Sequence, residues 1–165
     1  MPIDTIRRTS LFVVLLLAQV LVFNHVWLLG YATVFVFVYF VIQFPRNYPR
    51  WASLLWAFFF GLCVDLFANT AGMTSAALTL TAFVQPPLLE LFVPRDAPET
   101  MKTSVSTLGY GRFLALSSIL VLLFCLLFFT LEAFTFFHWQ QWTFNVVGTS
   151  LLTIVFLMAL ETIRR

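Results

Sequence analysis

Long charge-free runs of apolar residues dominate the pattern along this chain. The first covers residues 9–45, and shorter ones cover 51–64, 66–89, 113–131 and 133–160. A bilayer core about 30 Å thick takes roughly 20 apolar residues as an α-helix. No run alternates apolar and polar residues as a barrel strand does, and backbone groups in lipid must be bonded within the segment. The runs are therefore predicted to be membrane-spanning helices.

Six spans are predicted, and the whole chain, 1–165, is interpreted as one compact all-α membrane bundle. The approximate spans are 11–23, 32–44, 51–68, 73–93, 113–134 and 143–163. Asn24, His25 and Gly30 interrupt the first run, so its turn is expected between residues 24 and 31. The turn 69–72 has four residues, which makes the third and fourth spans adjacent and antiparallel.

Basic residues set the predicted orientation. With six spans, all nine Lys and Arg residues fall on one face of the membrane. The positive-inside rule makes that face cytoplasmic and places both termini there. Five or seven spans would scatter the basic residues over both faces. The first span is expected to stay uncleaved, because no small-residue cleavage site follows it.

The composition excludes several classes of protein. Of the 165 residues, 61% are hydrophobic and only 10% are charged, too few to cover the surface of a soluble domain. The net charge of +2 is too small for a nucleic-acid-binding protein. Cys63 and Cys125 lie in apolar runs and predict neither disulfides nor a zinc site. No phosphate-binding or nucleophile motif is present, so no catalytic, cofactor or metal residues and no enzyme activity are expected.

The predicted cytoplasmic loop, 94–112, is the largest soluble piece of the chain. Its nineteen residues are too few for a catalytic domain. Three interpretations remain open for it: a plain connector, a short surface helix around 98–106, or a contact site for a cytoplasmic partner.

Asp65 is the most informative position in the sequence. It lies fourteen residues beyond Trp51, about 21 Å along a helix axis. This places a carboxylate in the outer third of the bilayer, which is costly without a partner. Free N–H groups at the start of the following helix, and the hydroxyls of Thr74 and Ser75, are candidate partners. Asp65 could fasten a helical hairpin, contact a partner protein, or handle a proton or solute, and these roles could overlap.

Small and polar residues form a stripe around Asp65. Ala57, Gly61, Asp65 and Asn69 recur every four residues and so share one face of the third span. Small residues at this spacing let another helix approach closely. The fourth span supplies a plausible mate, because it carries the small residues Thr74, Ser75, Ala76, Ala77, Thr79, Thr81 and Ala82.

Glu90 is a further candidate, near the cytoplasmic end of the fourth span. It is interpreted as an interfacial carboxylate paired with Arg95 or Arg46. Pro86 and Pro87 precede it and are expected to kink or thin the helix.

The segment GLCVDLFANTAGMTSAALTLTAFV, residues 61–84, resembles the MreD family of rod-shape-determining proteins. In that family, a Gly-Leu-x-x-Asp-Leu segment precedes a short turn ending in Gly and then an apolar helix. Here these residues are Gly61, Leu62, Asp65, Leu66 and Gly72.

The likeness extends over roughly residues 19–84 and has limits. The aromatic-rich segment 34–48, with its Pro and basic residue at the end, is also similar to the family's second span. The sequence GYATVF, 30–35, departs from the Pro-Asp or Pro-Asn that the family often has there. The long loop 94–112 is another departure.

The resemblance implies a non-catalytic scaffold of the bacterial inner (cytoplasmic) membrane. Such proteins act in the cell-elongation machinery, which maintains cell shape and builds the lateral wall. The implied partners are MreC, through packing of transmembrane helices, the actin homologue MreB, and the peptidoglycan glycosyltransferase and transpeptidase, within membrane lipids. The implied fold is similar to the substrate-binding membrane subunits of energy-coupling-factor transporters. A groove for the MreC helix is expected at Ala57 and Gly61, with Asp65 and Asn69 at its outer end.

Two other functions place different demands on the structure. A solute-binding membrane subunit of a transporter is the alternative, and it needs a polar cavity, open to the outer face, near Asp65, Asn69 and His25. An intramembrane enzyme needs paired carboxylates within hydrogen-bond reach. Asp65 and Glu90 are predicted on opposite sides of the bilayer, which argues against the enzyme.

Overall fold

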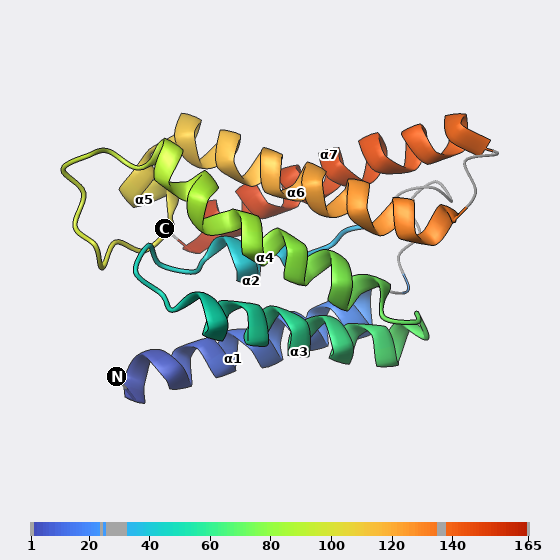
Figure 1. Ribbon diagram of the computed structural model, residues 1–165, viewed down its shortest axis with the longest axis horizontal. Helices are drawn as coiled ribbons and strands as arrows, with labels where there is room; N and C mark the ends of the chain where they lie inside the picture. Colours follow the sequence, from blue (N-terminus) through green and yellow to red (C-terminus); the bar gives the residue numbers. More distant parts are fainter. Residues whose placement is uncertain (1, 24, 26–32, 135–137, 165) are drawn as a thin grey trace.

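The computed structural model describes residues 2–23, 25, 33–134 and 138–164, and these ranges contain helices and connections but no strand. Figure 1 shows the arrangement. The elements are α1 (Pro2–Ala18), which continues into a π-helical turn η1 (Gln19–Phe23), then α2 (Val38–Ile42), α3 (Arg50–Ala68), α4 (Met73–Phe92), α5 (Val105–Leu108), α6 (Tyr110–Ala133) and α7 (Trp139–Arg164).

Five helices in the described residues are long and apolar enough to cross a membrane. They are Ile3–Val22 and the four helices α3, α4, α6 and α7. Their outward faces expose large apolar side chains, among them Leu55, Phe59, Phe83 and Leu151. Such extended apolar surface is unusual for a protein in water but suits contact with lipid. The five helices therefore suggest a membrane protein.

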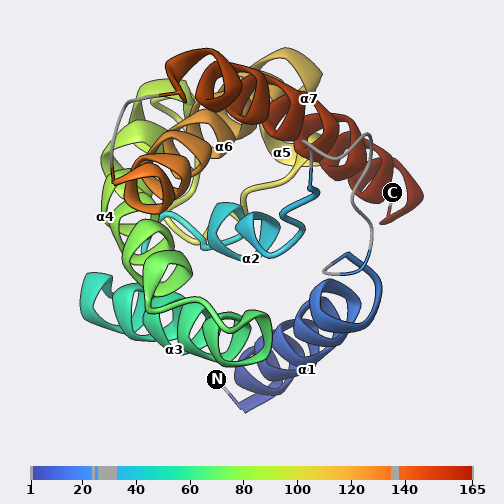
Figure 2. The ribbon, with the colours of Figure 1, turned by 90° about the vertical axis from the view of Figure 1, so that its right-hand side faces the viewer.

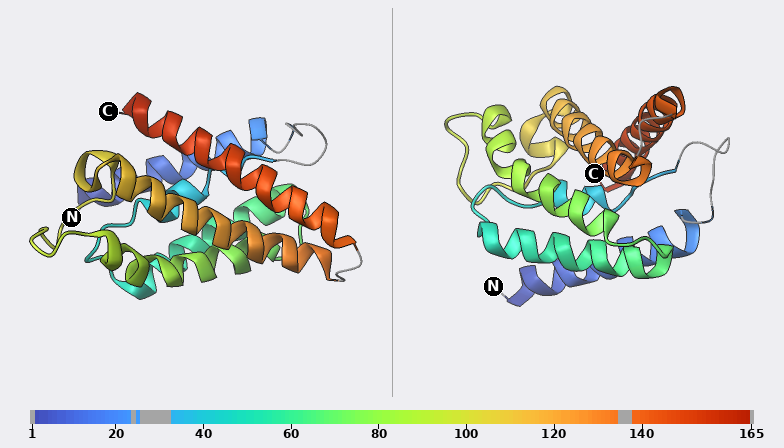
Figure 3. Two further views of the ribbon diagram at one scale, coloured as in Figure 1. Left: turned by 90° about the horizontal axis from the view of Figure 1, so that it is seen from above. Right: turned by 45° about the vertical axis from the view of Figure 1, so that its right-hand side comes forward.

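The long helices form an open ring around α2. Seen along the bundle, the order is α1, α3, α4, α6 and α7, with α2 in the middle (Figure 2). The closest neighbours are α3 with α4, α4 with α6, and α6 with α7, while α2 contacts α1, α4 and α6. Helices α6 and α7 lie together at one end and diverge toward the other, where α5 packs against α6 (Figure 3).

The two chain termini lie at the same end of the bundle, here named the termini end (Figure 1). The opposite end, named the turn end, carries the 69–72 connection. Helices α1 and α3 both run from the termini end to the turn end, and α4 runs back. The eight described basic residues all lie on segments of the termini end: Arg7, Arg8, Arg46, Arg50, Arg95, Lys102, Arg112 and Arg164.

Most predicted helix boundaries are close to those observed. The spans 51–68 and 73–93 correspond to α3 and α4 within one residue at each end. Helices α6 and α7 begin three and four residues earlier than predicted, and α1 begins at Pro2 rather than residue 11. Arg7 is exposed and Arg8 is half-buried against the Tyr48 ring. Arginine is a good helix former, so the helix extends over both. The expected turn at 24–31 lies outside the described residues except for His25.

The predicted second span, 32–44, is not a continuous helix. Only Val38–Ile42 is α-helical between residues 33 and 49. The sequence VFVFVYFVI alternates β-branched and aromatic residues, which disfavours a helix, and the following Pro45 cannot continue one. Every residue from 34 to 42 is nevertheless buried. The segment thus forms the centre of the core.

Aromatic rings surround this central segment. Phe37 is fully buried, with ring centroids 5.9 Å from Phe60 of α3 and 5.2 Å from Phe124 of α6. Phe35 contacts Phe124 and Phe128, at 5.2 and 5.1 Å. These edge-on and tilted contacts are the favoured arrangements of aromatic pairs. The chain has 21 Phe residues. These contacts explain part of that number, because the Phe side chains pack the long helices against the central segment.

Side chains of neighbouring helices bond the non-helical backbone at the turn-end side of the segment. The Phe35 N–H donates to Thr153 Oγ1 at 3.2 Å, and the Val36 N–H donates to Gln19 Oε1 at 3.1 Å. Both acceptor residues are buried. Irregular backbone at membrane depth is tolerated only where protein surrounds and bonds it. Gln19 and Thr153 supply that bonding here.

The termini-end side of the segment is bonded in the same way. The Phe44 carbonyl accepts from Gln85 Nε2 at 3.3 Å and from Thr103 Oγ1 at 3.0 Å. Both donor residues are buried. Part of the 94–112 loop therefore closes the bundle, and its short helix is α5 rather than the predicted 98–106.

Candidate functional site

Asp65 lies at the end of α3, and its carboxylate binds the first turn of α4. The side chain is 4% exposed. Oδ1 accepts the Thr74 N–H at 3.0 Å and Oδ2 accepts the Ser75 N–H at 2.9 Å. The first N–H groups of a helix have no partner within it, so they form a ready anion site. The contact with these N–H groups, expected from the sequence, is present.

The turn between α3 and α4 has two residues in the left-handed region. They are Asn69 (φ 55°) and Gly72 (φ 76°), and glycine adopts this conformation at least cost. The N–H groups of Asn69 and Thr70 both donate to the Asp65 carbonyl. The Thr70 hydroxyl also donates to Asp65 Oδ1, at 2.5 Å. The hydroxyl that reaches the carboxylate thus comes from the turn, whereas the sequence pointed to hydroxyls of α4. These bonds of Asp65 are called the hairpin contact below.

Gly61 allows α3 and α4 to approach closely. A Cβ placed on it would lie 2.3 Å from the Ser75 Cα and 2.7 Å from the Ser75 nitrogen. Ala57, one turn earlier on the same face, is 0% exposed. The close packing that this stripe permits is therefore between α3 and α4, and the expected groove for a partner helix at Ala57 and Gly61 is filled by the chain itself. Asn69, at the end of the stripe, is exposed.

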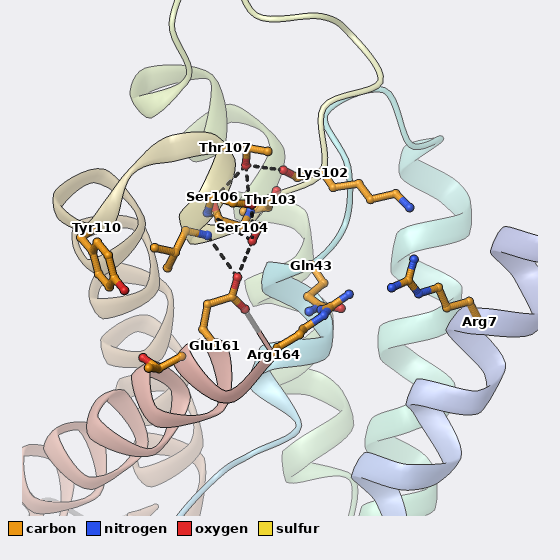
Figure 4. A pocket seen from close by; sticks show the side chains of 12 residues that line it. Arg7, Gln43, Lys102, Thr103, Ser104, Ser106, Thr107, Tyr110, Glu161 and Arg164 are labelled. Atoms are coloured by element: carbon orange, nitrogen blue, oxygen red, sulfur yellow. Dashed lines mark hydrogen bonds between the residues drawn. The ribbon is translucent and has the colours of Figure 1, made fainter.

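A second buried carboxylate, Glu161, lies near the end of α7 and is 6% exposed. Oε2 accepts the Tyr39 hydroxyl, and Oε1 accepts the Ser104 hydroxyl and the Val105 N–H, the last at 3.1 Å. Arg164 Nη1 donates to the Tyr39 hydroxyl oxygen at 3.3 Å. This group, named the Glu161 cluster, joins α7 to α2 through Tyr39. It also joins α7 to the start of α5, and Figure 4 shows that contact.

Glu161 was not predicted as a site residue, although its position carries a signal. An acidic residue in the last turn of a helix is disfavoured by the helix dipole and therefore needs a partner. Its main partner could not be inferred, because Tyr39 is 122 residues away.

Glu90 does not form the predicted ion pair. It is exposed, and no ion pair joins it to Arg95 or Arg46 in the part of the chain that is described. Arg46 Nη1 instead donates to the Ala97 carbonyl, at 3.4 Å. Helix α4 continues through the two prolines before Glu90. Glu90 therefore remains at the bundle surface.

A cavity of about 410 Å³ lies at the turn end, next to the hairpin contact. Its polar lining includes Gln19, His25, Thr33, Thr70, Thr74, Glu132 and Asn145, and its aromatic lining includes Phe35, Phe37, Phe67, Phe128 and Phe129. Asn145 Oδ1 is buried and has no hydrogen-bond partner among the described residues. An apolar cavity of this size with a few polar groups is typical of small-molecule sites.

The geometry thus offers a fastened α3–α4 hairpin, a buried carboxylate cluster at the termini end and a mixed cavity at the turn end. Comparison with known proteins adds no family: no family model, curated protein or solved structure matches the chain.

Proposed function

We propose that the chain is a non-catalytic membrane scaffold of the bacterial cell-elongation machinery, similar to the MreD family. One observation carries the proposal: three of the five motif residues of the resemblance each have a defined place in one hairpin. Gly61 is at the closest helix approach, Asp65 bonds the start of α4, and Gly72 has the left-handed conformation at the turn. Motif residues that together form one structural unit support membership of a family better than the sequence pattern alone.

The proposed topology has six passes in the inner membrane. Five are the long helices, and the second is the buried segment 33–46, which is irregular but bonded by its neighbours. Because the described basic residues gather at the termini end, we assign that end to the cytoplasm. Both termini are then cytoplasmic.

The proposed partner surface is the outward face of α3. It carries large exposed apolar side chains, including Leu55, Phe58, Phe59 and Phe67. The hairpin contact fastens α3 to α4, and a preorganised face loses less freedom on binding. The transmembrane helix of MreC is proposed to pack there. MreB and the peptidoglycan glycosyltransferase and transpeptidase are the further partners that the resemblance implies.

The test is recovery of MreC with the tagged full chain in mild detergent, read by mass spectrometry. The double variant Phe58→Ala with Phe59→Ala is expected to reduce the recovery of MreC strongly. A rod-shaped host cell that carries it is expected to become round. Leu122→Ala with Leu126→Ala is the matched control, since it truncates exposed apolar residues on α6 instead. Unchanged recovery in the α3 variant would exclude this surface, and absence of all elongation proteins from the wild-type sample would exclude the function.

A solute-binding transporter subunit is the second candidate, favoured by the turn-end cavity and the unpaired Asn145 Oδ1. The cavity lies near Asp65 and His25, where such a subunit requires one. A screen of small polar solutes for a rise in the melting temperature tests it, with Asn145→Leu expected to abolish the rise. Recovery of an ATPase module with the chain would favour transport, and a flat screen would count against it.

A further inference from the structure

Three cationic side chains line one cavity at the termini end. Arg7 comes from α1, Lys102 from the loop before α5, and Arg164 from the end of α7. The cavity has a volume of about 360 Å³. Their charged groups face the same space in Figure 4. The fold, rather than any local sequence motif, brings these three cations together.

The positive charge of this cavity is only partly balanced. Asp4 lies 3.6 Å from Lys102. The Glu161 carboxylate borders the cavity, but its oxygens are engaged by the Glu161 cluster. Neither Arg7 nor Arg164 has a carboxylate within ion-pair distance among the described residues. Gathered like charges repel one another, and a bound anion would relieve that repulsion.

An apolar side adjoins the cations. A smaller cleft of about 60 Å³ shares the three cationic residues with the larger cavity. It adds Asp4, Arg8, Leu11, Phe40, Phe44 and Pro45 to the lining, and Asp4 is the carboxylate already paired with Lys102. Leu11 lies one turn beyond Arg7 on α1, toward the middle of the bundle. The combined space, named the basic cleft, is therefore cationic at the bundle end and apolar further in, which matches an amphipathic anion.

We propose that the basic cleft binds the phosphate group of an anionic phospholipid, with the start of the acyl chains beside Leu11 and α1. Guanidinium groups bind phosphate with two parallel hydrogen bonds. Basic pockets between membrane helices on the cytoplasmic side recognise lipid head groups in this way. The inference rests on the membrane placement in the proposed function and is independent of the scaffold role and of MreC.

The experiment uses the delipidated full chain in neutral detergent. The probes are phosphatidylglycerol, phosphatidylcholine and inorganic phosphate, and the readouts are the melting temperature and lipid retention in native mass spectrometry. The cleft variant is Arg7→Gln with Lys102→Gln and Arg164→Gln. The control is Arg50→Gln with Arg95→Gln and Arg112→Gln, which removes the same charge from exposed positions of the same end outside the cleft.

Wild type and control are expected to bind phosphatidylglycerol in preference to phosphatidylcholine. The cleft variant is expected to bind it roughly a hundredfold more weakly, since three cations near the head group are lost. Equal phosphatidylglycerol binding by the cleft variant and the control would overturn the proposal, as would equal binding of the two lipids by wild type.

Inorganic phosphate separates the two sources of the anion. Suppose that inorganic phosphate raises the melting temperature, phosphatidylglycerol does not, and the cleft variant loses the effect. The cleft would then be a phosphate site, and its assignment to a lipid would be overturned. Arg164 also bonds Tyr39, so Arg7→Gln with Lys102→Gln serves as the cleft variant if the triple variant does not fold. Loss of MreC recovery in the α3 variants would leave all of these results unchanged.

Discussion

Gly61 and Ser75 lie so close that a Cβ on residue 61 would be 2.3 Å from the Ser75 Cα. The Ser75 backbone is also held by the next turn of the same face of α3, since its N–H donates to Asp65 Oδ2. The close packing of α3 on α4 thus requires both the glycine at 61 and the carboxylate at 65. The glycine sets the separation of α3 and α4, and the carboxylate holds the start of α4 in place.

Gly61→Ala is expected to lower the stability of the bundle, because the added methyl group must push α3 and α4 apart. Overpacking of this kind costs about 1–3 kcal/mol. The melting temperature in neutral detergent measures it. Gly111→Ala is the matched control, because no heavy atom lies within 4 Å of a Cβ there and alanine favours a helix. Equal melting temperatures for the two variants would show that the close approach does not limit packing.

Substitutions at the hairpin contact are expected to destabilise in a defined order. Thr70→Val removes one hydrogen bond, Asp65→Asn removes the charge, and Asp65→Leu leaves the N–H groups of Thr74 and Ser75 unbonded. A hydrogen bond to a charged group contributes about 1.5–3 kcal/mol, so Asp65→Leu should lower the melting temperature most and Thr70→Val least. Amide hydrogen exchange at residues 74 and 75 should rise in the same order. Asp96→Asn, in the exposed loop, should change neither.

The hairpin was predictable from the sequence because its interactions are local. Asp65 and Ser75 are ten residues apart. A four-residue turn requires the two helices to be adjacent and antiparallel. The first N–H groups of α4 then lie within hydrogen-bond distance of the Asp65 carboxylate. The same locality explains why the bounds of α3 and α4 were predicted closely.

The centre of the bundle was not predictable in this way. A charge-free run shows that residues 32–44 are buried but not how their backbone is bonded. The Phe35 N–H finds its acceptor on Thr153, 118 residues away. Glu161 finds Tyr39 at a similar sequence distance. Only the assembled ring brings these residues together, so a single sequence without its relatives gives no signal for the pairs.

The polar residues that bond the central segment yield a third prediction. Thr153→Val and Gln19→Leu each leave one backbone N–H of the segment, at Phe35 or Val36, without its acceptor. An unsatisfied buried donor costs about 1–3 kcal/mol, and the loss should appear as a lower melting temperature. Thr162→Val is the control, because Thr162 is an exposed residue of α7 whose hydroxyl donates to the Met158 carbonyl of the same helix. If Thr153→Val and Thr162→Val had the same melting temperature, the N–H of Phe35 would have another hydrogen-bond acceptor.

The Glu161 cluster yields the last prediction, which concerns the closure of the bundle by the loop. Glu161→Leu removes the acceptor of Tyr39, Ser104 and Val105 at once, whereas Tyr39→Phe removes one donor to Glu161 and the acceptor of Arg164. The first variant is therefore expected to release the segment 101–108, seen as faster hydrogen exchange and faster proteolysis between α4 and α6. Glu90→Gln is the control, because Glu90 is exposed and forms no ion pair among the described residues. A double-mutant cycle between residues 39 and 161 should give a coupling of about 0.5–3 kcal/mol, the range for contacting residues. Additive effects would mean that the hydroxyl and the carboxylate act independently. Unchanged exchange in Glu161→Leu would mean that the Thr103 hydrogen bond and the apolar contacts of Val105 and Leu108 hold the loop without Glu161.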